Sequence, residues 1–398
     1  VLNFAHGGVG MIGAFAFYSW RADGMAVPLA LALALLLGAA IGVAIHVVVM
    51  RPLRRAPPLA RLIATLGLLT LLLAFGTERW GDTARIVPKL LPIDGIKVFS
   101  GTIIGRDRLM LAAIALGLTL VLQAVYRFSQ FGRATTAVAE SRMVTASLAV
   151  SPDLIAAANW AVGTALAVFG AILIVNVTGL QVVGLTLLVI PALAAALVGG
   201  FRSFPLTLIG GLAIGILESE VAYLQTKVSD PASVAGLGRA VPFLVIISVL
   251  VVRGRALPLR SEVAERPPEV GSGKVRPIAF PLVVLSGVLL VGLGLPDNLV
   301  EAATSTAAVA IVALSLTVVT GFAGQLSLAQ FALAGMGAWM AARLVVNWDL
   351  PFELAAIVGI LGAIPLGVVI GLPALRTRGV NLAVVTLGLA LVIESLVL

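Results

Sequence analysis

The stretch MAVPLALALALLLGAAIGVAIHVVVM, residues 25–50, contains no charged residue. A helix that crosses a membrane needs about 20 apolar residues, because the hydrocarbon layer is about 30 Å thick and a helix rises about 1.5 Å per residue. This stretch is long enough to cross the layer completely. It therefore predicts a transmembrane helix, and a membrane protein.

Similar runs recur along the whole chain. They are found at 8–20, 60–76, 108–126, 153–177, 186–200, 203–224, 240–252, 278–295, 303–320, 327–346, 353–372 and 379–398. These runs are continuous rather than alternating, which disfavours the strands of a membrane barrel. Several are short, and we expect some of them to be tilted or re-entrant. The predicted fold class is all-α, a polytopic integral membrane protein.

The composition agrees with this fold class. Of 398 residues 60% are hydrophobic and 11% are charged, whereas a soluble protein carries about 25% charged residues. The chain has no cysteine, which excludes disulfides and thiolate metal sites, and its two histidines, His6 and His46, are too few for a histidine metal cluster. We therefore expect no metal site, and no pattern suggests catalytic residues.

The positive charges predict the orientation of the chain in the membrane. The formal net charge is +8, but the basic residues lie in short clusters between apolar runs, which is the pattern of cytoplasmic loops rather than of nucleic-acid binding. We place one set of basic positions inside the cell: Arg51, Arg54, Arg55, Arg61, Arg127, Arg133, Arg142, Arg202, the stretch 253–276, Arg376 and Arg378. The segment 77–107 then lies outside, and its prolines and glycines predict turns and a short hairpin.

Residues 254–277 predict a flexible cytoplasmic linker. This stretch is charged, rich in proline and glycine, and has no apolar face. It includes Gly271-Ser272-Gly273-Lys274, but a phosphate-binding loop needs the full glycine spacing and a Ser or Thr after the lysine, and Val275 stands there.

The segments on either side of this linker resemble each other. Leu2-Asn3-Phe4-Ala5-His6 aligns with Leu326-Ser327-Leu328-Ala329-Gln330, and Ala64-Thr65-Leu66-Gly67-Leu68 aligns with Val385-Thr386-Leu387-Gly388-Leu389. The two anchors occur in the same order, which predicts a duplication. The second copy has about fifty residues before its first anchor and the first copy almost none, so we expect the chain to be cut at both ends.

Four stretches together resemble the membrane permeases of branched-chain amino acid ABC importers. They are Leu2–Gly7 with Gly13-Ala14; Arg51–Arg54 followed by Ile63–Gly67; Gly199-Gly200 with Pro205, Gly210-Gly211 and Glu218; and Gly321–Leu328. Residues 1–253 resemble the H-type subunit without its first helix, and residues 278–398 resemble a C-terminally truncated M-type subunit. The predicted fold is thus one of tandem homologous permease repeats in the cell inner (plasma) membrane.

The resemblance implies two ABC ATPase subunits and an extracytoplasmic solute-binding protein as partners. ATP would be bound by the ATPase subunits, so we expect no cofactor in this chain. The remaining partners are a small-molecule substrate and the lipid bilayer. The chain itself carries no nucleotide-binding motif and is not predicted to be an enzyme.

Polar residues in apolar segments are candidates for the substrate pathway, because unsatisfied polar atoms are costly in a membrane and usually face protein or water. The candidates are Asn3, His6, Thr65, Glu218, Gln325, Ser327 and Gln330. Hydrogen bonding between neighbouring helices is the alternative for the pathway candidates, and structural pairing at the interface is the alternative for Glu218.

The segment 127–152 resembles the family's coupling helix, which docks into a groove of the ATPase subunit. Its mixture of alanines and charges is typical of one short amphipathic helix, and the candidate contacts are Arg133, Ala137, Glu140 and Arg142. Family members usually differ from this chain at Thr136, Ser141 and Ala149. The alternative is an interfacial helix on the lipid headgroups.

We therefore expect the permease of an ATP-driven importer of branched-chain amino acids. A related importer of urea or short amides is the closest alternative. An ion-coupled secondary transporter or channel is a different class, and it generally needs charged residues near the midplane, of which few are found here. An inactive fragment is the third alternative.

Overall fold

The computed structural model describes residues 3–99, 102–147, 150–228, 236–253, 278–292, 296–322, 325, 327–374 and 380–397. The chain divides into two compact units, Val1–Glu220 and Val221–Leu398, and each is described by itself. The predicted linker at 254–277, with Gly271-Ser272-Gly273-Lys274, lies outside the described residues.

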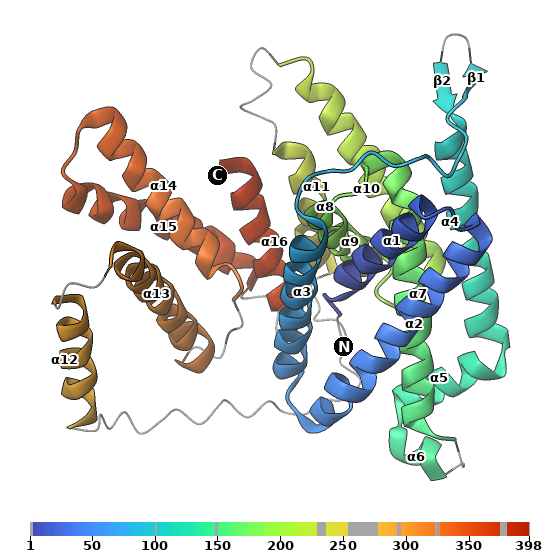
Figure 1. Ribbon diagram of the computed structural model, residues 1–398, viewed down its shortest axis with the longest axis horizontal. Coiled ribbons are helices and arrows are strands. Elements are labelled where there is room, and N and C mark those ends of the chain that lie inside the picture. The colour runs from blue at the N-terminus through green and yellow to red at the C-terminus, as the bar shows by residue number, and fades with distance from the viewer. Residues whose placement is uncertain are drawn as a thin grey trace. The chain divides into compact units, whose positions relative to one another are not determined.

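The first unit is almost entirely helical (Figure 1). In chain order it contains α1 (His6–Ala22), α2 (Val27–Ile45), the π-helix η1 (His46–Met50), the 3-10 helix η2 (Pro52–Arg55), α3 (Pro58–Trp80), β1 (Gly95–Phe99), β2 (Thr102–Gly105), α4 (Arg106–Phe128), α5 (Gln130–Glu140), α6 (Arg142–Ser147), α7 (Pro152–Thr178), α8 (Val182–Leu187), α9 (Val189–Val198) and α10 (Phe204–Gln225).

Six helices among the described residues are long and apolar enough to cross a membrane. They are Val27–Met50, Ala60–Trp80, Arg106–Phe128, Pro152–Thr178, Phe204–Gln225 and Leu299–Phe322. The all-α, polytopic fold class predicted from the apolar runs is confirmed. The run at 186–200 falls in two short helices, α8 and α9, that meet at Leu188.

The longest of the six candidate spans is α7, and its ends follow from local sequence. Ser151 precedes Pro152, and its side chain accepts a hydrogen bond from the Leu154 N–H at 3.4 Å, which caps the first turn. Proline at the first helical position suits this start, because its missing N–H would be unpaired there anyway. The helix ends at Thr178, and Gly179 follows it with a φ of +78°, which suits glycine.

Helices α1, α2 and α7 pack closely in the first unit. A methyl group on Gly13 of α1 would overlap the Val168 side chain of α7, and one on Gly42 of α2 would overlap the Thr164 hydroxyl. Glycines allow such close approach of helix backbones. Phe15 of α1 is 1% exposed, so α1 lies inside the unit rather than on its surface.

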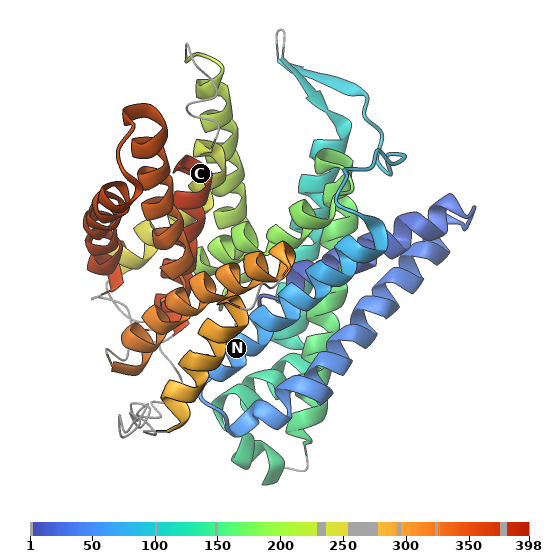
Figure 2. The same ribbon diagram turned by 60° about the vertical axis from the view of Figure 1, so that its left-hand side comes forward.

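The first unit has a different short element at each end of its long helices (Figure 2). Strands β1 and β2 form an antiparallel hairpin, with Ile96 opposite Ile104, and this confirms the hairpin predicted within 77–107. Helices α5 and α6 lie at the opposite end. The segment 77–107 also reaches α7, because Asn176 Oδ1 accepts the Leu90 N–H at 2.7 Å.

The second unit contains the helices that follow Val221. They are α11 (Leu237–Arg253), α12 (Ala279–Gly292), α13 (Asp297–Leu316), the π-helix η4 (Thr317–Phe322), α14 (Gln330–Trp348), α15 (Phe352–Ala374) and α16 (Val380–Val397). Helix α11 packs on α16, where a methyl group on Gly388 would lie 2.9 Å from Cδ1 of Phe243. The compact units thus divide at Glu220, before α11, while the sequence division at 253 rests on resemblance and stays a prediction.

Candidate functional site

The predicted coupling helix consists of two helices instead of one, α5 and α6, which we call the α5–α6 segment (Gln130–Ser147). Ser141 separates them with φ −152° and ψ 110°, which is an extended conformation that a helix cannot continue through. The expectation of a single amphipathic helix is therefore corrected. The segment turns at Ser141 and brings Arg142 back towards the long helices.

Helix α5 begins directly after α4, at a tight corner. The Ser129 side chain accepts the Gly132 N–H at 3.1 Å and caps α5. Any Cβ at Gly132 would collide with the backbone of Tyr126. Glycine is therefore required at this position, and the corner has little freedom to open.

A polar bridge joins α5 to the membrane-spanning helices. Asn159 on α7 donates from Nδ2 to Oγ1 of Thr135 at 2.9 Å, and its Oδ1 accepts the hydroxyl of Tyr126 at 2.8 Å. All three side chains are partly buried. One residue of α7 thus connects α4, α5 and α7 through directional bonds.

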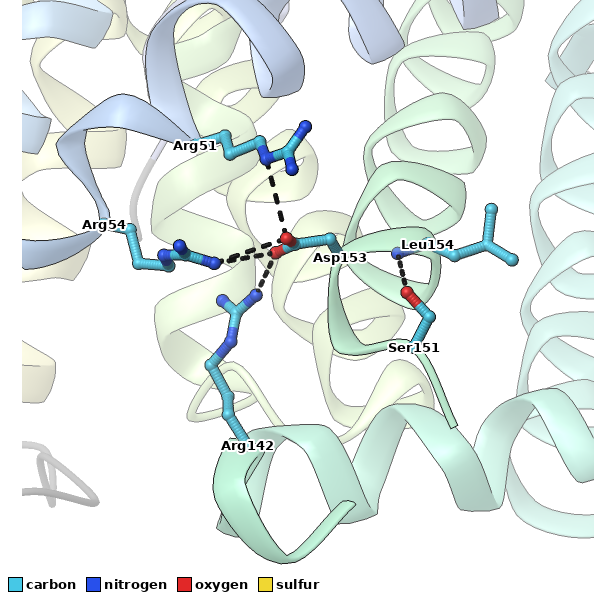
Figure 3. Close-up of polar contacts among 6 residues, drawn as sticks. All are labelled: Arg51, Arg54, Arg142, Ser151, Asp153 and Leu154. Atoms are coloured by element: carbon cyan, nitrogen blue, oxygen red, sulfur yellow. Dashed lines mark hydrogen bonds and ion pairs between the residues drawn. The ribbon is translucent and has the colours of Figure 1, made fainter. Parts of the chain in front are cut away.

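A second connection, the Asp153 cluster (Asp153, Arg51, Arg54 and Arg142), joins α6 to α7 (Figure 3). The Asp153 carboxylate lies 2.5 Å from Nη2 of Arg142, 3.3 Å from Nη1 of Arg54 and 3.6 Å from Nε of Arg51. Arg142 starts α6, Arg54 lies in η2, and Arg51 lies between η1 and η2. The Asp153 carboxylate of α7 therefore connects α7 to α6 and to the segment around η2.

The charges of the Asp153 cluster also bear on the predicted orientation. Arg51, Arg54 and Arg142 were assigned to the cytoplasmic side from the distribution of positive charge alone. The structure brings all three to one carboxylate, so they lie at the same end of the first unit. Three guanidinium groups surround one carboxylate and leave an excess of positive charge there, as the positive-inside rule expects of cytoplasmic loops.

The four candidate coupling residues have different surroundings. Arg133 is exposed and donates from Nη1 to the Phe128 carbonyl at 3.1 Å. Ala137 is half-buried and Glu140 is exposed. Arg142 is bound to Asp153 within the chain, and the apolar side chain of Met143 beside it is 85% exposed. Arg133, Glu140 and Met143 are therefore exposed enough to contact another molecule, although Arg133 also bonds the chain, whereas Arg142 is held by Asp153.

Asn3 and His6 form a pair at the start of α1. The Asn3 amide hydrogen-bonds Nδ1 of His6, and its Oδ1 accepts the Ala5 N–H at 3.0 Å. The His6 ring faces Trp160 of α7 with 6.4 Å between ring centroids. Both polar residues are only half-buried. We call Asn3–His6 the polar start of α1.

The remaining candidates of the first unit do not belong to this pair. Thr65 is fully buried in α3 and donates to the Leu62 carbonyl at 2.8 Å. Glu218 is half-buried in α10, and no hydrogen bond or ion pair joins it to another of the described residues. Phe204, at the other end of α10, has its ring centroid 5.3 Å from that of Tyr126, with the rings tilted, near the α5–α6 segment. Glu218 therefore lies towards the opposite end, as the sequence predicts.

In the second unit, the start of α14 repeats the local geometry of the start of α1. The Ser327 hydroxyl accepts the Ala329 N–H at 3.4 Å, at the position that corresponds to the Asn3–Ala5 bond. The Leu328 N–H donates to Thr386 at 2.9 Å, so the two aligned anchors of the second copy touch. Gln330 Oε1 accepts the Ser315 hydroxyl at 3.4 Å, and the Gln325 N–H donates to the Val319 carbonyl.

Two residues with prominent roles in the geometry, Asp153 and Asn159, were missed by the sequence analysis. Asp153 follows Ser151-Pro152, which resembles an ordinary helix start, and Asn159 is a single amide in an apolar run. The available signal was charge balance, because Asp153 is the acidic residue that follows a series of basic clusters. An unpaired carboxylate at a membrane interface would have been a reason to look for its partners.

The apolar spans, the charge distribution and the polar segment at one end define a multi-pass permease of the inner membrane. More specifically, the chain belongs to the family described as branched-chain amino acid transport system, permease component, which matches residues 1–250 and 298–398. The family resemblance predicted from the four stretches is confirmed.

Individual relatives support the same family. The high-affinity branched-chain amino acid transport system permease protein LivH of Salmonella typhimurium is 28% identical over 283 residues, which cover 66% of this chain and 87% of LivH. BraD, the corresponding permease protein of Pseudomonas aeruginosa, is 31% identical over 236 residues, covering 55% of this chain and 76% of BraD. LivH of Escherichia coli is 28% identical over 279 residues. No solved structure matches the chain.

Proposed function

We propose that this chain forms the membrane pathway of an ATP-driven importer of branched-chain amino acids. The observation that carries the proposal is the family match on two separate segments, 1–250 and 298–398. The named relatives are transport permeases of high-affinity branched-chain amino acid systems rather than enzymes. In this proposal residues 1–253 act as the H-like part, 254–277 as a linker, and 278–398 as the M-like part.

The driving force comes from partner subunits in this proposal. ATP is bound and hydrolysed by two ABC ATPase subunits, and an extracytoplasmic binding protein delivers the solute. The α5–α6 segment is the proposed ATPase contact. Its support is the exposure of Arg133, Glu140 and Met143 at the end of the unit opposite the β1–β2 hairpin.

The solute pathway is proposed to include the polar start of α1 and its counterpart at the start of α14. Both are short polar turns that precede a helix and bind the backbone two residues further on. Polar groups beside the end of a broken or interrupted helix are a common way for transporters to contact a solute. Thr65 and Glu218 complete the proposed set in the first unit, and Gln325, Ser327 and Gln330 complete it in the second.

Reconstitution tests the function directly. The chain is placed in vesicles with the ATPase subunits and binding protein of its own organism, and labelled leucine, isoleucine and valine are supplied in parallel with labelled urea. We expect accumulation of the three amino acids only with hydrolysable ATP. Accumulation of urea alone would move the proposal to the related importers, and uptake without ATPase subunits would overturn it.

A charge-reversal pair tests the ATPase contact. Arg133→Glu and Glu140→Lys change exposed side chains of α5, and Lys97→Glu changes an exposed side chain of the hairpin at the other end. We expect the two α5 variants to retain less ATPase in a pull-down, and Lys97→Glu to retain as much as the wild type. Equal retention by all three variants would refute the assignment of α5.

A further inference from the structure

The α5–α6 segment is attached to α7 at two places. Arg142 of α6 binds the Asp153 carboxylate at 2.5 Å, and Thr135 of α5 accepts from Asn159 at 2.9 Å. Asp153 and Asn159 are six residues apart, which is about 9 Å along the helix axis. Two attachments at different heights on one helix resist rotation as well as translation, so a displacement of the segment also displaces this end of α7.

The next part of α7 contacts the polar start of α1. Trp160 directly follows Asn159, and its ring centroid lies 6.4 Å from that of His6. One turn further, a methyl group on Gly163 would lie 3.2 Å from Nε2 of His6. The side chain that receives α5 and the surface that faces His6 are therefore adjacent on the same helix.

Along this stretch, α7 packs so closely on α1 and α2 that it cannot move independently of them. Positions Gly10 and Gly13 of α1 and Gly38 and Gly42 of α2 approach α7 so closely that a methyl group on any of them would meet atoms of α7 at less than 3.0 Å. Such close packing transmits small shifts, because it has no free space to absorb them. Arg51 and Arg54, which follow α2 after the π-helix η1, bind the same carboxylate and so connect the chain beyond α2 to α7.

We propose that α7 carries displacements of the α5–α6 segment to the polar start of α1, with Asp153 and Asn159 as its two positioning residues. This inference rests on the proposed function, because it assumes that ATPase subunits displace the segment. Neither residue touches the solute in this proposal. Each acts by holding the α5–α6 segment to the helix that bears against His6.

Energy coupling provides the first test. In the reconstituted complex, Asp153→Asn and Arg142→Gln each remove one side of the same ion pair with little change of shape. We expect each variant to retain ATPase subunits, yet to transport about fivefold less solute per ATP hydrolysed, which lies at the low end of typical coupling between sites. Asp153→Asn already breaks the only link that Arg142→Gln removes, together with the pairs to Arg51 and Arg54, so the double variant should be no worse than Asp153→Asn alone.

Two further variants separate positioning from folding. Ser151→Ala removes the helix cap beside Asp153 and should lower thermal stability without changing transport per ATP. Asp153→Glu keeps the charge and should restore part of the coupling. If Asp153→Asn and Arg142→Gln lose stability or ATPase binding while transport per ATP stays at the wild-type value, the positioning role is wrong.

A distance measurement provides an independent readout. The chain has no cysteine, so Met143→Cys and Leu154→Cys, at positions 85% and 69% exposed, can carry one spin label each. We expect the mean distance between the labels to stay the same with and without trapped ATP. When Asp153→Asn is added, the distribution of distances should become broader. A distance that changes with nucleotide in the otherwise wild-type chain would overturn the inference. If that chain shows no ATP-dependent uptake, the proposed function fails instead.

Discussion

The contact between α2 and α7 can be tested by the addition of one methyl group at Gly42. In the structure a Cβ at this position would lie 2.6 Å from the Trp160 carbonyl oxygen and 3.0 Å from its carbon, and it would overlap the Thr164 hydroxyl. The Thr164 hydroxyl already donates to the Trp160 carbonyl at 2.7 Å. Gly42→Ala therefore places a methyl group against backbone atoms that cannot rotate away.

The magnitude follows from the distance that must be recovered. Carbon–oxygen contacts are normally about 3.3–3.6 Å, so α2 and α7 would have to separate by roughly 0.7 Å. Overpacking of this kind costs about 1–3 kcal/mol. Gly170→Ala, on α7 itself, is the matched control, because nothing lies within 4 Å of its Cβ position. That variant should gain up to about 1 kcal/mol from the better helix propensity of alanine.

Chemical unfolding in detergent, followed by circular dichroism, measures both variants. We expect Gly42→Ala to unfold at lower denaturant than the wild type, and Gly170→Ala at the same or higher denaturant. The difference between them should be about 1–3 kcal/mol, the cost of overpacking alone, because the gain in helix propensity is common to both variants and cancels. If Gly42→Ala is as stable as Gly170→Ala, then α2 and α7 do not pack as closely as described, and α7 loses its proposed tie to α2.

Two other changes test single hydrogen bonds in the two units. Asn176→Ala removes the acceptor of the Leu90 N–H, and an unpaired buried group costs about 1–3 kcal/mol, so proteolysis within 81–94 should be roughly tenfold faster. Thr178→Ala is the control, because its hydroxyl bonds only nearby carbonyls, and it should leave the rate of proteolysis unchanged. Thr386→Val removes the acceptor of the Leu328 N–H, so the Leu328 amide should exchange its hydrogen faster than in the wild type or in Thr386→Ser. Equal exchange rates in all three proteins would show that the two anchors of the second copy do not touch.

The sequence alone was sufficient to predict that the protein spans a membrane, that it is helical, and to which family it belongs. These properties depend on composition and local pattern: an uncharged run such as 25–50 has no stable place in water, and it is long enough for one crossing. The predicted hairpin within 77–107 was also local, since its two strands, β1 and β2, are neighbours in the chain. Family membership depended on motifs that are contiguous in the chain.

The sequence could not show which polar residues meet. Asp153 lies 102 residues after Arg51 and 11 after Arg142, and nothing in the chain near Asp153 marks its partners. The break at Ser141 also escaped the pattern, because no proline or glycine near it marks the end of a helix. The aligned starts of α1 and α14 look equivalent in sequence, yet Ala14 of α1 is fully buried while Ala338, the aligned residue of α14, is exposed.

The sequence by itself determined what kind of protein this is, because hydropathy, charge and motif spacing act over a few neighbouring residues. The tertiary structure alone decided that α1 is enclosed by α2 and α7, and that the α5–α6 segment is held by Asp153 and Asn159. These facts depend on contacts between residues far apart in the chain. Packing of helices against one another, rather than any local preference, decides which of those contacts form.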